Sequence, residues 1–112
     1  MSEINLDSDL PKVEILEELI NYQEGSVVSR QIIKQKTGNV TLFAFAKDEG
    51  LSEHTAPFDA LVYILDGNAI VTIAEKEYHI KTGEFIIMPA NIPHALKAIE
   101  QFKMLLIMIK EG

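Results

Sequence analysis

Short apolar segments alternate with polar turns along most of the chain, which is the pattern of an all-β protein. From residue 26 onward, segments rich in valine, isoleucine and phenylalanine are separated by glycine, proline, asparagine or aspartate. We predict strands at Val27–Ile33, Val40–Ala46, Ala60–Leu65, Ala69–Ile73, Tyr78–Ile80, Phe85–Met88, Ile92–Leu96 and Phe102–Ile109. Many short strands at regular spacing predict an antiparallel sandwich or barrel.

Two turns between these strands have a clear local signal. Asp48-Glu49-Gly50 breaks the strand that ends at Ala46. Asp66-Gly67 is a dipeptide that suits a tight type I′ hairpin, so we expect Ala69–Ile73 to run back along Ala60–Leu65.

One stretch, Pro11–Gln23, has helical periodicity. Its apolar residues Val13, Leu16, Leu19 and Ile20 recur at helical spacing, and Gly25 follows its end. We therefore expect an arm, residues 1–25, with one short helix packed on the outside of a single barrel domain, residues 26–112.

The charge and composition narrow the function classes. The net charge is −7, and residues 1–24 carry seven acidic residues against one lysine, so the acidity belongs to the arm. Without a basic stripe, nucleic-acid binding is not expected. The chain has no cysteine, which excludes thiolate metal sites and a cysteine nucleophile. The N-terminus does not resemble a signal peptide and no apolar run has the length of a membrane span, so we expect a cytoplasmic protein and no membrane partner.

Two predicted strands are apolar on both faces. Phe102–Ile109 carries Met104, Leu106 and Met108 on one face and Leu105, Ile107 and Ile109 on the other, and Leu61–Leu65 is similar. A sheet with one face in water alternates apolar with polar residues. Because one short helix is too small to cover the outer face, a homodimer that buries it is our hypothesis.

Three histidines are the candidates for chemistry. His79 shares a strand face with Glu77 and Lys81, which indicates a surface residue. If the strand period extends back from Ala60, His54 points into the barrel with Ala56, Phe58, Ala60, Val62 and Ile64. His94 shares its face with Leu96 and Ala98 and is also predicted to point inward.

The segments around these two histidines resemble the two motifs of the cupin superfamily, and the resemblance covers roughly residues 26–110. The first motif has two histidines two apart, a glutamate four further on and a glycine after seven more. Those places here hold His54, Ala56, Ala60 and Gly67. The second motif is a glycine, a proline and a histidine, and its places here hold Gly83, Pro89 and His94, with Asn91 where the motif has a further glycine. The resemblance implies a jelly-roll barrel of a small single-domain bacterial cupin, often dimeric.

The departure from the family pattern bears directly on cofactors. In the family, three histidines and the glutamate usually hold one divalent metal, and two of those four positions are alanine in this chain. A stable metal site requires three or four protein ligands. We therefore expect no cofactor, with a divalent metal on His54 and His94 as the alternative. Met88, Met104 and Met108 offer thioethers for copper, but methionines at such positions are far more often core residues.

Ala56 and Ala60 would instead leave space in the interior of the barrel. The predicted pocket is a mostly apolar space with two imidazole anchors, formed by His54, His94, Ala56, Phe58, Ala60, Val62 and Met88. The first hypothesis is a small-molecule-binding domain for a partly apolar acid or carbonyl compound. The second is a metal-dependent enzyme of the isomerase, decarboxylase or dioxygenase kinds that the resemblance allows. The third is a metal-free enzyme with a histidine as general base.

Overall fold

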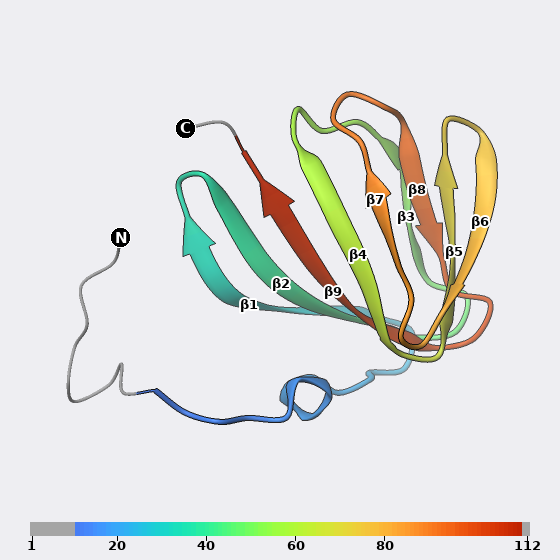
Figure 1. The fold of residues 1–112 in the computed structure, drawn as a ribbon. Coiled ribbons are helices and arrows are strands. Elements are labelled where there is room, and N and C mark those ends of the chain that lie inside the picture. Colours follow the sequence, from blue (N-terminus) through green and yellow to red (C-terminus); the bar gives the residue numbers. More distant parts are fainter. Residues whose placement is uncertain (1–10, 111–112) are drawn as a thin grey trace.

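The computed structural model describes residues 11–110, which form two facing antiparallel sheets (Figure 1). One sheet has five strands in the order β1-β2-β9-β4-β7, and the other has four in the order β3-β8-β5-β6. The strands are β1 (Val27–Gln35), β2 (Gly38–Phe45), β3 (Gly50–His54), β4 (Asp59–Asp66), β5 (Asn68–Ile73), β6 (Lys76–Lys81), β7 (Phe85–Met88), β8 (His94–Lys97) and β9 (Phe102–Ile109). This arrangement confirms the predicted all-β jelly roll.

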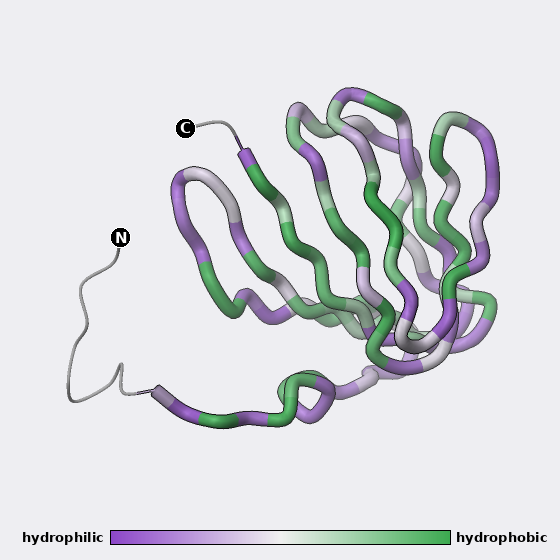
Figure 2. The backbone as a smooth tube through the Cα atoms, in the orientation of Figure 1, coloured by the Kyte–Doolittle hydropathy of each residue, from purple (hydrophilic) through white to green (hydrophobic). Residues whose placement is uncertain are grey.

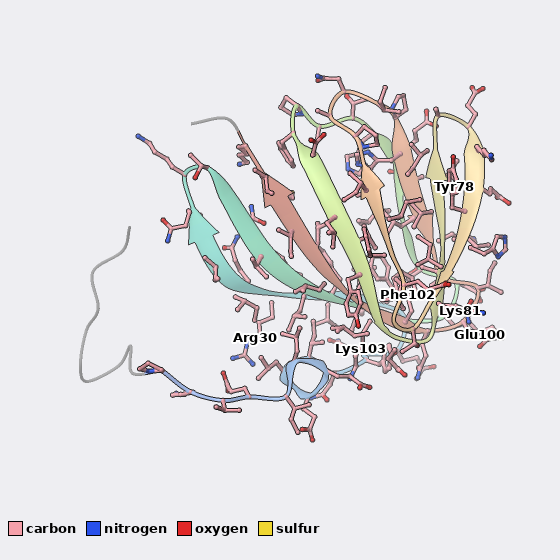
Figure 3. The ribbon with its side chains drawn as sticks, in the orientation of Figure 1. Arg30, Tyr78, Lys81, Glu100, Phe102 and Lys103 are labelled. Atoms are coloured by element: carbon pink, nitrogen blue, oxygen red, sulfur yellow. The ribbon has the colours of Figure 1, made fainter. Side chains whose placement is uncertain are left out.

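The core lies between the two sheets. Alternate residues of β4 and β9 point into it, so Val62, Ile64, Phe102 and Met104 are fully buried. The rings of Phe45 and Phe102 stack with centroids 4.5 Å apart, and Figure 3 shows Phe102 between the sheets. Apolar residues run along the middle of the strands, whereas the connections between strands mix polar and apolar residues (Figure 2). Burial of these apolar faces is the main stabilisation of such a sandwich.

One predicted turn was wrong. The Asp66-Gly67 turn is no hairpin, because β4 and β5 belong to different sheets and only Gly67 has a positive φ, at 80°. A side chain at Gly67 would collide with the main-chain oxygen of Gln101, so only glycine fits at this tight turn between the two sheets. Ala74 and Glu75, with φ of 50° and 69°, instead form the two-residue hairpin of type I′ kind between β5 and β6.

The predicted helix over Pro11–Gln23 is reduced to a 3₁₀ turn, η1 (Leu16–Leu19). Val13 of the proposed apolar stripe is fully exposed, whereas Ile20 packs against Leu42 and Ala44 on the outer face of the five-stranded sheet. A segment this short gains its stability from such packing rather than from helix propensity. No helix within residues 11–110 is long and apolar enough to cross a membrane.

The arm is fixed to the barrel by polar contacts. Lys103 Nζ donates to Glu17 O at 2.9 Å, and an Arg30 guanidinium nitrogen donates to Leu19 O at 3.0 Å. Both side chains approach the N-terminal segment in Figure 3. The first ten residues of the predicted arm lie outside the described residues. The boundary at residue 25 stays a prediction, and β1 begins two residues after it.

Candidate functional site

A cavity of about 160 Å³ is lined by residues of both sheets, among them His54 at the end of β3 and His94 at the start of β8. At this end of the sheets the β3–β4 and β7–β8 loops lie side by side (Figure 1). Six of the seven predicted pocket residues line it, namely His54, Ala56, Phe58, Ala60, Met88 and His94. The seventh, Val62, is fully buried in the core and is not among the lining residues. None of the described lining residues carries a carboxylate, so the two imidazoles provide the polar chemistry of this space.

Some lining residues were missed by the sequence analysis as pocket residues. They are Leu51, Leu96, Met104, Leu106 and Met108. The four on β8 and β9 share the inward face that the strand period predicts, so the signal was present in the alternation. What the sequence did not show is how far along each strand the core packing stops and the cavity begins.

A β-bulge in β3 turns His54 into the cavity. Leu51 pairs with Leu96 and His54 with His94, so three residues of β3 span two residues of β8. In a regular strand, residues three apart point to opposite faces. The extra residue therefore lets Leu51 and His54 both line the cavity, which is a common use of a bulge near a site.

The two imidazoles face each other across the β3–β8 pair. Their Nε2 atoms lie 3.1 Å apart, and their rings are inclined by 74°. His54 Nδ1 lies 2.9 Å from Ser52 O, and His94 Nδ1 lies 3.2 Å from Ile92 O. A carbonyl oxygen only accepts, so each Nδ1 carries its proton and donates it. Both neutral rings then present an Nε2 lone pair toward the same space, so a hydrogen-bond donor or a cation beside both nitrogens could be bound by the pair.

The two histidines differ in exposure. His94 is only 4% exposed, whereas His54 is exposed where the cavity meets solvent. Burial is the main cause that lowers the pKa of His94, and the charge of a protonated His54 lowers it further, against a small opposing effect of its bond to Ile92. His94 therefore favours its neutral form. His79 is exposed on β6, as predicted for a surface residue.

Two hydrogen bonds join the β3–β4 and β7–β8 segments at the mouth of the cavity. Asn91 N donates to Ala56 O at 2.7 Å, and Ala90 N donates to an Asp59 carboxylate oxygen at 2.8 Å. Asn91 has a φ of 64°, a left-handed conformation that asparagine tolerates better than most residues. These contacts hold the segment before His94 against the segment that follows His54.

The residues present do not fit a conventional divalent metal centre. Such a centre requires three or four nitrogen, oxygen or thiolate donors. Within residues 11–110 no group of three His, Asp or Glu side chains is placed to hold a metal, so His54 and His94 form an incomplete set.

Comparison with known proteins places this fold in a family. The pattern described as "Cupin domain" matches residues 41–110. A conserved protein of unknown function from Streptococcus pyogenes has a similar structure, with a TM-score of 0.89 and 37% identity over 100% of this chain and 97% of that one. A cupin 2 conserved barrel domain protein from Leptotrichia buccalis is 44% identical over 85% of this chain but only 46% of its own, with a TM-score of 0.82.

A third structure extends the comparison to more distant proteins. A cupin superfamily protein from Desulfitobacterium hafniense is 28% identical over 98% of this chain and 100% of its own, with a TM-score of 0.86. No functionally curated protein matches the sequence. Since the domain pattern covers more than half of the chain and the fold agrees over its whole length, the chain belongs to the cupin family.

Proposed function

We propose that this cupin domain binds a small, partly apolar molecule in the cavity, with the polar end of the molecule at the His54–His94 pair. The observation that carries the proposal is the pair itself. Two Nε2 atoms 3.1 Å apart, each ring fixed by a main-chain carbonyl, form one polar point on the wall of an apolar space. That composition is typical of a small-molecule site.

The departure from the cupin motif supports a ligand other than a coordinated divalent metal. Ala56 and Ala60 stand at two of the positions where the family pattern has metal ligands, and both line the cavity. Alanine offers no lone pair, so these positions contribute space instead of coordination.

The size and chemistry of the cavity limit the ligand class. A volume of about 160 Å³ suits a compact molecule, since an apolar cavity of about 150 Å³ holds a benzene ring. Because both Nε2 atoms are acceptors in the neutral pair, the best polar end is one that brings its own proton. A phenol meets both conditions near neutral pH, and a carboxylic acid meets them below its own pKa, where it still carries its proton.

The test compares phenol with toluene, which have nearly the same shape and differ in the hydroxyl group. We expect phenol to bind more tightly by about 1 kcal/mol, or roughly fivefold, in calorimetric or NMR titrations. The His54→Ala variant should lose this preference, whereas the exposed-site control His79→Ala should keep it. Equal affinity for the two compounds, or an unchanged preference in His54→Ala, would refute the proposal.

A metal-free enzyme is the second candidate, and the environment of His94 favours it. Burial lowers the pKa of His94, so its imidazole is neutral near pH 7, as a general base must be. Once a substrate is known, the reaction rate can be measured as a function of pH. A fall in rate at acidic pH that is present in the wild type and absent in His94→Gln would support this role. A metal-dependent activity is less favoured because only two of the usual donors are present.

A further inference from the structure

We propose that the same cavity binds one Cu(I) ion, held by His54, His94 and the thioethers of Met88 and Met108. The inference rests on the proposed function in one respect, since the cavity must admit a solute. It differs in the occupant, a soft monovalent metal ion instead of an organic acid.

The imidazole half of the site is already oriented. Each Nδ1 is occupied by a main-chain carbonyl, so each Nε2 lone pair is free to bind a metal, which is the arrangement that outer hydrogen bonds give to histidine ligands. Two nitrogens 3.1 Å apart can both lie about 2.0 Å from one ion.

The sulfur half comes from the strand register. Ala60 of β4 pairs with Met88 of β7 on one side and with Met108 of β9 on the other. The two methionines thus flank the small residue at the histidine end of the cavity, and both line it. All three methionines within residues 11–110 line this one cavity, which concentrates the soft donors of the described chain at one place.

The charge of the cavity selects a monovalent ion. The two imidazoles and two thioethers are neutral, and none of the described lining residues supplies a carboxylate. The free energy needed to move an ion out of water rises with the square of its charge. Desolvation therefore costs a divalent ion about four times as much as Cu(I) in the same apolar space. Thioether ligands also select Cu(I), whereas Mg²⁺, Ca²⁺ and Mn²⁺ prefer oxygen donors.

The test is an anaerobic competition for Cu(I) between the protein and a chromophoric Cu(I) chelator. We expect one Cu(I) per chain, and the Met88→Leu/Met108→Leu double variant should bind at least roughly tenfold more weakly. Ile64→Leu is the matched control, because Ile64 is fully buried on β4 but does not line the cavity, so this variant should bind as the wild type does. Methionine-to-leucine and isoleucine-to-leucine changes nearly conserve volume, so thermal unfolding should show all variants folded.

Two further measurements complete the test. X-ray absorption of the Cu(I) protein should show sulfur as well as nitrogen neighbours, and Zn²⁺ should bind more weakly than Cu(I). The inference is overturned if the double variant binds Cu(I) like the wild type, if only nitrogen neighbours are found, or if Zn²⁺ binds as tightly. The phenol–toluene titration on metal-free protein is independent of these results. A retained preference for phenol with no Cu(I) binding overturns the metal inference alone.

Discussion

The Nε2 atoms of His54 and His94 lie 3.1 Å apart, and neither ring can turn its Nε2 away without losing the bond from its Nδ1 to a carbonyl two residues earlier. The same local contact, a hydrogen bond from Nδ1 to the carbonyl oxygen two residues earlier, thus fixes the orientation of both rings. The two strands that carry them pair directly, so no loop movement is needed to bring the rings together. Such fixed geometry is what a polar anchor in an apolar cavity requires.

The buried histidine should make the protein less stable in mild acid. The pKa of His94 is lowered in the folded state, whereas in the unfolded chain it is near 6.5. The native protein then binds fewer protons, so the free energy of unfolding should fall as pH drops below about 6.5 and continue to fall through the lower pKa of the folded state.

Urea unfolding between pH 5 and pH 8 measures this dependence. His94→Gln removes the titrating group and should flatten the decline below pH 6.5. The control, His79→Gln, should keep the slope of the wild type. An unchanged slope in His94→Gln would show that other groups cause the acid sensitivity.

The bulge in β3 yields a prediction about a deletion. Removing Glu53 leaves His54 two residues after Leu51, so a regular ladder would still pair His54 with His94 and point it inward. We therefore expect the deletion variant to fold and to keep its preference for phenol over toluene in NMR titration. Glu53→Ala, which keeps the bulge, is the control. A folded deletion variant without that preference would show that the bulge itself sets the ring orientation.

This bulge also shows how far the sequence could predict the site. Counting back from Ala60 with a period of two gave the correct inward face for His54, but counting forward from Leu51 gives the opposite face. The pattern alone cannot locate the extra residue, because the bulge depends on pairing with β8, which is distant in sequence. For the same reason β3 was missed as a strand, whereas the long apolar strand Phe102–Ile109 was predicted with the observed bounds.

The β5–β6 hairpin has residues that do not suit its turn. Ala74 and Glu75 both adopt left-handed backbone conformations, which cost roughly 1–2 kcal/mol for each residue with a side chain. Glu75→Gly should therefore raise the free energy of unfolding by about 0.5–1 kcal/mol, since the greater freedom of glycine in the unfolded chain offsets part of the gain. Chemical denaturation measures the change. Glu77→Gly, within strand β6, should lower stability instead.

The arm should contribute to stability through one buried side chain. Ile20 is 4% exposed and packs on the outer face of the five-stranded sheet, whereas Ile15, five residues earlier, is 66% exposed. Ile20→Ala should cost about 2–4 kcal/mol in denaturant unfolding, and Ile15→Ala should cost less than about 0.5 kcal/mol. Similar small losses for both variants would mean that the arm detaches without consequence for the barrel.

The homodimer stays a prediction, and the structure now defines the face that it would bury. A row of apolar residues in register crosses all five strands of the larger sheet on its outer side: Ile33, Val40, Ile107, Leu61 and Ile87. The arm packs on the neighbouring residues Leu42, Ala44 and Leu105, and Ile33 and Ile87 remain 49% and 44% exposed. A continuous apolar row with exposed residues at both ends and half-buried ones between them is typical of an interaction surface.

A second copy is the partner that we expect on this row, because a two-fold axis places the same apolar strip against itself. Sedimentation at micromolar concentration should give the mass of two chains. Ile87→Lys adds a charge to the row and should give a monomer, whereas Lys76→Ala, on the β5–β6 hairpin of the other sheet, should not change the mass. A monomeric wild type at that concentration would contradict the prediction, and the exposed row would then need another explanation.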